Sequence, residues 1–240
     1  MTDSFSIIPL NRLLGLILNQ LKNGTYFGSP SERFFTQNDP RLVTTHLKLA
    51  LHTPIGVAAG PHSQLAQNIV GAWLCGARFI ELKTVQTLDE LNVTKPCIDM
   101  QDEGYNCEWS QELKIHESFE QYLNAWIIIH ILNFRFNKNN NVPIGTIFNM
   151  SVGYNLEGIL NQNVQWFFEK MQDCKSEKDA KIKEIKHLVP KIEQITIPDR
   201  ISNNITLSTM HGCPPDEIER IGQYLIATKN LHTVIKLNPT

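Results

Sequence analysis

Two lysines near the carboxyl ends of predicted strands are the residues best suited to chemistry. Lys83 lies in the segment ELKTV and Lys236 in the segment IKLNPT. A cation held at such a position can stabilise the negative charge that collects on a reduced flavin, or it can form a Schiff base when it is desolvated. One such lysine alone is weak evidence, because it is more often an ordinary residue that reaches solvent. The pair favours a site, because strand-end amides accompany it: Asn149, Asn155 and Asn238.

The loop formed by residues 206–215, with the sequence TLSTMHGCPP, brings hydroxyls, one imidazole and the thiol of Cys213 into a tight turn. Such a loop can supply a proton donor next to a bound substrate. Alternatively, Gly212 and the two prolines only turn the chain, and Cys213 is a small buried apolar residue. Both interpretations stay open on these residues alone.

No metal or dinucleotide motif accompanies these residues. His62, His116 and His211 are too far apart in the sequence for a local metal motif. The five cysteines form no CxxC pair, so they indicate neither a zinc or iron-sulfur site nor a disulfide framework. Gly56 and Gly60 do not belong to a GxGxxG motif, and a Rossmann fold is not supported. We therefore predict no metal site in this chain.

The stretch 53–85 must position Lys83. Residues 55–59 are apolar or small and end at a Gly-Pro pair, which is typical of a buried parallel strand. From residue 64 onward, apolar residues recur at intervals of three and four, as on one face of an amphipathic helix, and Gly76 suits the end of that helix. Residues 79–85 then form a second strand, which carries Lys83 near its carboxyl end.

Three further strands are predicted at residues 144–152, 204–209 and 234–237, with helical patterns between them. Such alternation predicts a parallel sheet with right-handed crossovers. A TIM barrel has eight strands and places its chemistry at their carboxyl ends. We therefore expect an α/β fold, a partial TIM (β/α)8 barrel with about five of the eight strands, in a truncated piece of a longer chain. Residues 53–240 would form the N-terminal part of this barrel, and residues 1–52 a covering helix and a hairpin.

The other segments are mostly helical. Residues 43–52 alternate as a half-buried strand or hairpin does. Residues 176–193 are strongly charged and are predicted to be a solvated helical insertion set apart from the core. The long connection at residues 86–108 is rich in acidic residues, and loops of that length are more often functional than idle. Helical patterns cover residues 9–22, 109–136, 156–173 and 215–229.

Composition narrows the class of partner and compartment. The formal net charge is -2 and the pI is about 6.4, so no basic field attracts nucleic acid or anionic lipid, and we predict neither partner. The longest apolar runs are far shorter than the roughly 20 helical residues that cross a bilayer, and the segment MTDSFSII is not a secretory signal. Unpaired cysteines fit a reducing, cytoplasmic compartment.

Five short motifs follow the predicted strands in order: VAAG at 57–60, ELKT at 81–84, NMSVGYN at 149–155, LSTMHG at 207–212 and KLNP at 236–239. Together they resemble the flavin-binding barrel that dihydroorotate dehydrogenases and dihydropyrimidine dehydrogenase share. The strings GPHSQLAQNIV, FIELKTVQ, FNMSVGYNLEGI and LSTMHGCPPDEIE are even more similar to the selenate reductase flavoprotein subunits of the YgfK type. The resemblance covers essentially the whole chain.

The resemblance implies FMN in the mouth of the barrel. The backbone of residues 58–60 would contact the isoalloxazine ring, and Lys83 and Lys236 would lie near its pyrimidine edge. In the longer relatives, FAD and iron-sulfur domains lie elsewhere in the polypeptide, so other oxidoreductase subunits are expected partners. The cofactor-binding positions that the resemblance indicates are Ala58, Ala59, Gly60, Lys83, Thr84, Asn149 and Lys236.

On the substrate side, the resemblance implies that Asn155 hydrogen-bonds a planar cyclic amide stacked on the flavin. In dihydropyrimidine dehydrogenase the corresponding fourth-strand loop reads asparagine, leucine, serine, cysteine, and the cysteine donates the proton. Here Thr206 stands at the asparagine position and Thr209 at the cysteine position, so the proton donor is either Thr209 or Cys213. The remaining substrate positions are Ser208 and Asn238.

Three functions follow from these residues. The leading hypothesis is a fragment of an FMN-dependent oxidoreductase that transfers hydride between the flavin and a small cyclic amide of purine or pyrimidine type, with Lys83 among the catalytic residues. The alternatives are a lyase that uses Lys83 or Lys236 as a Schiff-base amine, and a non-catalytic barrel that scaffolds an oxidoreductase complex. The residues do not indicate selenate chemistry. We expect this piece alone to be inactive, flavin-free and poorly soluble, because unpaired strand edges invite aggregation.

Overall fold

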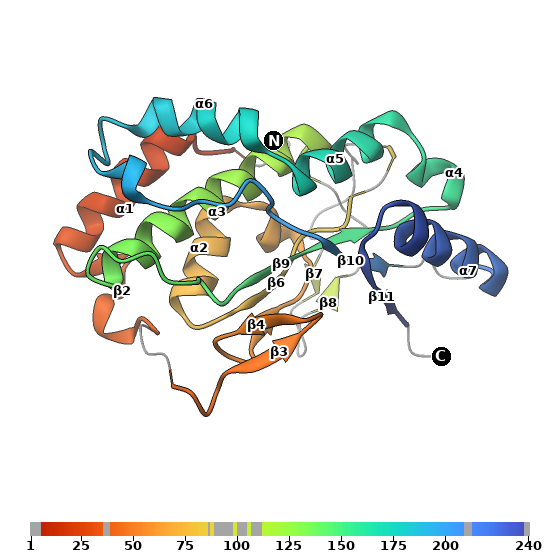
Figure 1. Ribbon diagram of the computed structural model, residues 1–240, viewed down its shortest axis with the longest axis horizontal. Helices are drawn as coiled ribbons and strands as arrows, with labels where there is room; N and C mark the ends of the chain where they lie inside the picture. The colour runs from red at the N-terminus through yellow and green to blue at the C-terminus, as the bar shows by residue number, and fades with distance from the viewer. Residues whose placement is uncertain are drawn as a thin grey trace.

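Five parallel strands form the central sheet of the computed structural model, which describes residues 6–35, 39–85, 87–88, 98–99, 105–106, 112–208 and 213–237 (Figure 1). The strands are β5 (Gly56–Val57), β6 (Phe79–Glu81), β9 (Ile147–Val152), β10 (Asn204–Ser208) and β11 (His232–Lys236). Each strand pairs with the one before it in this series, so the sheet grows in one direction only. A singly wound parallel sheet is the winding of a TIM barrel, whereas a doubly wound sheet reverses. The predicted partial barrel is confirmed.

The two faces of the sheet differ in chemistry because successive side chains alternate. On β9, Phe148, Met150 and Val152 belong to the hydrophobic core, and Asn149 and Ser151 therefore occupy the opposite face. All six residues of β9 are buried. The helices cover the apolar face, and the polar face corresponds to the inside of the barrel.

Helix α3 (Ile115–Phe136) is buried on nearly all sides. Its sequence YLNAWIIIHIL is apolar all round rather than on one stripe, which is the pattern of an internal helix. It packs against α2 (Ala66–Leu74) and α5 (Gln162–Gln172). The helical pattern predicted from residue 109 begins at Ile115 in the structure.

The helix predicted at residues 156–173 is interrupted. It consists of α4 (Leu156–Ile159) and α5, separated by Leu160 and Asn161. The Asn155 side chain caps α4 by accepting a hydrogen bond from the Gly158 amide at 2.9 Å. The predicted last helix is α7 (Pro215–Gln223), which continues as one π-helical turn, η4 (Tyr224–Thr228).

The segments before the barrel agree with the sequence. Helix α1 (Leu10–Lys22) buries four apolar side chains, and β3 (Thr44–His46) and β4 (Leu49–Leu51) form the hairpin. The two turn residues, Leu47 and Lys48, have φ values of 50° and 63°, which match the twist of a tight hairpin. The shorter elements are β1 (Thr25–Tyr26), β2 (Ser29–Pro30), β7 (Ile98–Asp99), β8 (Tyr105–Asn106), η1 (Ser31–Arg33), η2 (Pro61–Gln64) and η3 (Ile192–Gln194).

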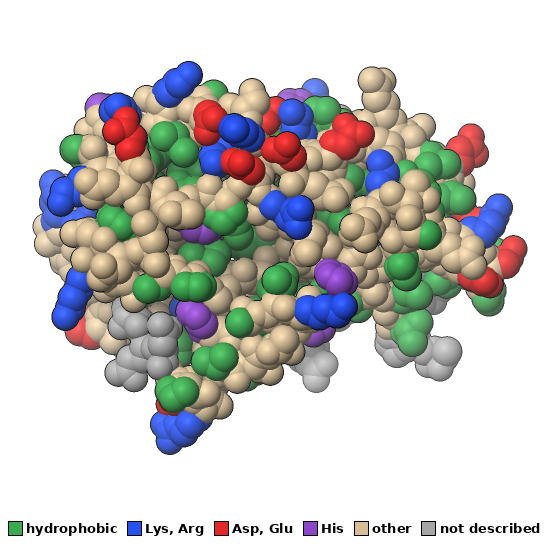
Figure 2. Space-filling view, viewed as in Figure 1, with side chains coloured by type: hydrophobic (Ala, Val, Ile, Leu, Met, Phe, Trp, Pro, Cys, Tyr) green, Lys and Arg blue, Asp and Glu red, His purple; other side chains and the backbone are tan. Residues whose placement is uncertain are grey.

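The charged segment is not set apart from the core, and this prediction was wrong. Helix α6 (Lys175–Ile185) lies beside α1, and Ile185 is fully buried in the core cluster (Figure 1). Figure 2 shows cationic and anionic side chains interspersed along the outer side of this part of the molecule. Few apolar residues of α6 pack against the core, so its charged sequence did not indicate that it packs there.

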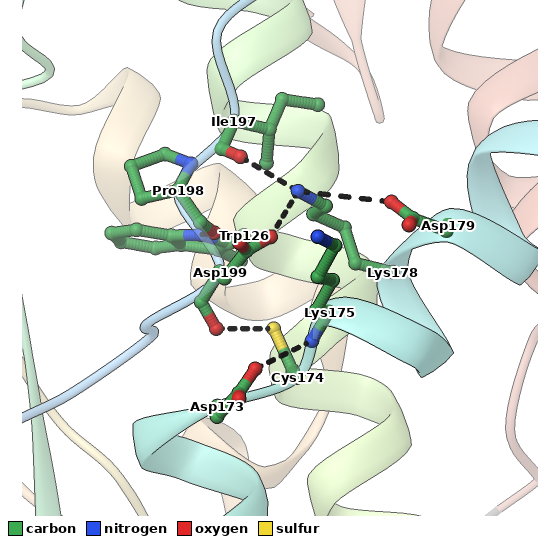
Figure 3. Close-up of polar contacts among 9 residues, drawn as sticks. All are labelled: Trp126, Asp173, Cys174, Lys175, Lys178, Asp179, Ile197, Pro198 and Asp199. Atoms are coloured by element: carbon green, nitrogen blue, oxygen red, sulfur yellow. Dashed lines mark hydrogen bonds and ion pairs between the residues drawn. The ribbon is translucent and has the colours of Figure 1, made fainter.

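Polar contacts fasten α6 to the segment that follows it (Figure 3). The Lys178 ammonium donates to the Ile197 carbonyl at 3.0 Å and pairs with Asp199. The Cys174 thiol donates to the Asp199 carbonyl at 2.9 Å, and burial raises the pKa of this thiol to about 12. Trp126 on α3 donates its indole N–H to the Pro198 carbonyl at 3.1 Å. These contacts hold the chain in place just before β10 begins.

Candidate functional site

A row of polar side chains crosses the inner face of the sheet toward the carboxyl ends of its strands. Glu81 is paired in register with Asn149, and the Asn149 amide donates to the Thr206 hydroxyl at 2.7 Å. Asn149 is fully buried and Thr206 is 6% exposed. Residues of β6, β9 and β10 therefore share one continuous polar surface.

Side chains from β6 and β11, the first and last strands of this row, approach each other. The Lys236 Nζ lies 4.0 Å from the Glu81 Oε1. Two strands separate β6 from β11, so their backbones would be about 14 Å apart in a flat sheet. The two side chains meet because they are long and both extend from the concave face of a curved sheet. Lys236 is paired in register with Ser208, which places that hydroxyl beside it on the neighbouring strand.

An irregularity after β6 gives Lys83 and Thr84 their positions. Glu81 pairs with Asn149 and Val85 pairs with Val152, so β6 has one residue more than β9 between these pairs. An extra residue of this kind is a β-bulge, which re-aims side chains and is common at barrel rims and active sites. Leu82 and Val85 both enter the hydrophobic core as a result.

The two residues inside the bulge are both buried and polar. Lys83 is 4% exposed, and its carbonyl oxygen accepts a hydrogen bond from the Tyr122 hydroxyl at 3.5 Å. The Thr84 hydroxyl lies 2.8 Å from that of Ser151, which shares the inner face with Asn149. Thr84 is thereby tied to the inner face of β9.

The end of β5 contributes backbone groups. The Ala59 amide donates to the Glu81 Oε2 at 3.4 Å, and the Gly60 amide donates to the Ser63 hydroxyl at 3.1 Å. Gly60 is buried in this turn. Ala58 is exposed. The expected cofactor-binding segment thus lies next to Glu81.

Two acceptor atoms in this row have no hydrogen-bond partner among the described residues. They are the Asn149 Oδ1 and the Glu81 Oε1, and both are buried. Buried polar atoms of folded proteins are nearly always satisfied, so each unsatisfied one needs an explanation. A ligand with N–H donors on one edge would satisfy the Asn149 oxygen, and Lys236 would suit an edge that carries negative charge.

Other predicted site residues lie apart from this row or outside the described residues. Asn155 is exposed at the start of α4 and caps it. Cys213 is half-buried just before α7. Burial, with smaller contributions from Glu217 and Asp216, raises the pKa of its thiol, so the thiol stays protonated near neutral pH. Thr209 and Asn238 lie outside the described residues.

Sequence reasoning missed two residues of the site, Glu81 and Ser151. Glu81 was detectable, because it stands at an inward position of a predicted strand, where a polar side chain interrupts apolar neighbours. Ser151 gave no signal of its own within the string NMSV.

A cavity of about 730 Å³ lies at the other end of the barrel. Residues at or before the starts of β9 and β10 line it, including Ile147 and Asn204, together with His130 of α3. Since TIM barrels carry their chemistry at the carboxyl ends of strands, this cavity is not the candidate site. Within the described residues, His, Cys, Asp and Glu side chains do not gather into a group that could hold a metal ion.

A singly wound parallel sheet with a polar inner face at its carboxyl end defines a domain of the TIM-barrel class. Residues 27–240 match the family described as oxidoreductase YgfK, N-terminal TIM-barrel domain. The chain belongs to this family.

Two curated relatives come from Escherichia coli, strain K12 and serotype O157:H7. Each bears the name "Putative oxidoreductase YgfK" and is 42% identical to this chain over 262 aligned positions. The alignment covers all of this chain but 25% of each relative, so the chain spans about a quarter of their length. None of the helices that the structure describes is both long and apolar enough to cross a membrane.

Proposed function

We propose that this domain binds FMN at the carboxyl ends of its strands and serves an oxidoreductase that acts on a cyclic amide of purine or pyrimidine type. One observation carries the proposal. Lys236 meets Glu81 over the inner face, next to the buried Asn149, whose carbonyl oxygen has no hydrogen-bond partner among the described residues. The resemblance to flavin-binding barrels and membership of an oxidoreductase family support it.

The chemistry of the residues fits the isoalloxazine ring. The Asn149 Oδ1 would accept the ring N–H, and the Ala59 and Gly60 backbone would pack along the ring. Lys83 and Lys236 would hold positive charge near the pyrimidine edge, where a reduced flavin is anionic. When bound, FMN would supply the hydride chemistry; the chain supplies binding, orientation and electrostatics. The contact between the Thr84 and Ser151 hydroxyls would keep the bulge after β6 in place beside the flavin.

Substrate would lie against the loop after β10. Thr206 already accepts a hydrogen bond from Asn149, which leaves its own O–H to donate to a substrate carbonyl. Ser208 offers a second hydroxyl, and Asn155 and Asn238 are the proposed amide partners. Cys213 suits the role of proton donor because its raised pKa keeps the thiol protonated, and Thr209 is the alternative.

Substitution of Lys83 tests the proposal. The full-length protein should carry FMN, identified by visible absorbance and by mass after acid release, and Lys83→Met should lose most of that flavin. Lys183→Met is the matched control, since Lys183 is exposed on the outer helix α6, and it should retain the flavin. Wild-type protein without bound flavin would refute the proposal. We also propose that the flavin exchanges electrons with FAD and iron-sulfur centres. These centres would lie elsewhere in the polypeptide or in partner subunits, and the protein would work in the cytoplasm.

A lyase is the second candidate, because Lys83 is almost fully buried and a desolvated amine is a better nucleophile. Borohydride treatment in the presence of a carbonyl substrate would trap a Schiff base on Lys83 as a covalent adduct. The flavin proposal predicts no adduct at this residue. Peptide mass spectrometry separates the two functions.

A further inference from the structure

Glu81 links three strands of the sheet through one carboxylate. Its Oε2 accepts the Ala59 amide of the β5 loop at 3.4 Å, and its Oε1 lies 4.0 Å from the Lys236 ammonium of β11. Glu81 itself lies on β6, and its side chain is 14% exposed. Both of its contacts are residues assigned above to the flavin.

These contacts are too long to explain the residue as a stabilising ion pair. Burying a carboxylate is costly unless close hydrogen bonds and an opposite charge compensate it. Here one oxygen makes a 3.4 Å contact, and the other makes no hydrogen bond among the described residues. A glutamine could accept the Ala59 hydrogen bond equally well. What distinguishes glutamate at this position is its negative charge.

We propose that Glu81, through its negative charge, sets the reduction potential of the flavin bound beside Ala59 and Lys236. This inference rests on the proposed function. Among the described residues, Lys83 and Lys236 contribute positive charge to the site, and Glu81 contributes a negative charge. A negative charge opposes the gain of electrons by a neighbouring ring, so Glu81 lowers the potential and makes the reduced flavin a better donor.

The test compares uncharged and charged residues at position 81 in the full-length protein. Glu81→Gln should raise the ratio of reduced to oxidised flavin about tenfold at a fixed solution potential, equivalent to about 30 mV for a two-electron couple. The measurement is equilibration with a reference dye of known potential. Glu81→Met, uncharged and of similar length, should shift the potential in the same direction and serves if the glutamine variant does not fold.

Two controls separate charge from structure. Glu81→Asp keeps the carboxylate and should keep a potential close to that of the wild type. Glu157→Gln removes an exposed carboxylate from α4 and should change nothing. A purely structural role for Glu81 would alter flavin affinity without moving the potential.

The outcomes distinguish the two proposals. If the flavin stays bound and its potential is unchanged or falls in Glu81→Gln and Glu81→Met, the role of Glu81 is refuted while FMN binding stands. If the wild-type protein binds no flavin, the proposed function fails, and the role of Glu81 fails with it. A rise in both uncharged variants, absent in the aspartate variant, supports the inference.

Discussion

His130 should make the domain sensitive to mild acid. This residue lies inside α3 and is 8% exposed, and its Nδ1 is 2.8 Å from the Trp126 carbonyl oxygen. Burial lowers the pKa of His130 from 6.5 to about 4; the nearby Lys178 acts in the same direction, and the hydrogen bond with Trp126 opposes it. The folded state therefore holds a neutral imidazole at pH values where an unfolded chain would protonate it.

The sign and size of the effect follow from these two pKa values. Well above pH 6.5 both states are neutral at His130, and its contribution to stability is fully present. As the pH falls toward about 4, the unfolded state alone takes up a proton, and stability is lost. Between pH 7 and pH 5 the loss amounts to about 2 kcal/mol.

Replacing the imidazole with a neutral amide tests this reasoning. We expect the wild-type protein to lose about 2 kcal/mol more than His130→Gln in the free energy of opening of α3 between pH 7 and pH 5. Amide hydrogen exchange of α3 peptides, followed by mass spectrometry in the full-length protein, measures that free energy. His116→Gln is the control, because His116 is exposed on the first turn of the same helix and should leave the wild-type response intact.

Equal responses of the wild type and His130→Gln would refute the argument from burial. Such a result would mean that the folded protein accommodates a charged imidazole inside α3. Exchange of the imidazole C2 proton would then show His130 titrating like a solvated histidine. Slow exchange, with little titration above pH 5, is the expected result.

Two further predictions concern a turn and a thiol. Gly145 has a φ of 55°, and a Cβ there would lie 2.2 Å from the His52 ring, so Gly145→Ala should cost about 2 kcal/mol in urea-induced opening of the domain. Gly15→Ala, on α1 with nothing within 4 Å of its added Cβ, should instead be neutral or slightly stabilising, and equal losses would contradict the steric reasoning. Cys213 should react with iodoacetamide more slowly than a cysteine in an unstructured peptide at the same pH, because its raised pKa lowers the thiolate fraction. Peptide mass spectrometry measures the labelling rate, and faster labelling of Cys213 would contradict this prediction.

The strands of the barrel were predictable because apolar runs bounded by glycine and proline mark buried parallel strands. The run IGTIFNMSV indicated β9, and the structure confirms it. The order of the strands along the chain then predicted their order in the sheet, because consecutive strands of a barrel are neighbours. The positions of Lys83 and Lys236 near strand ends followed from the same boundaries.

The finer arrangement was not predictable from patterns. The bulge at Lys83 and Thr84 places two consecutive polar residues on one side of the strand, which strict alternation cannot represent. The interruption between α4 and α5 falls at Leu160 and Asn161. Asn155 caps the start of α4, and an asparagine that caps a helix looks in sequence like one that binds a ligand. The packing of α6 depends on few apolar anchors within a charged segment.

The pairing order of the sheet has a consequence for biosynthesis. Within the described sheet, each strand after β5 joins a neighbour that left the ribosome before it. Lys236 reaches Glu81 only when β11, the fifth strand of this sheet, has been made. This charge pair can therefore form only after the four earlier strands of the described sheet have been made.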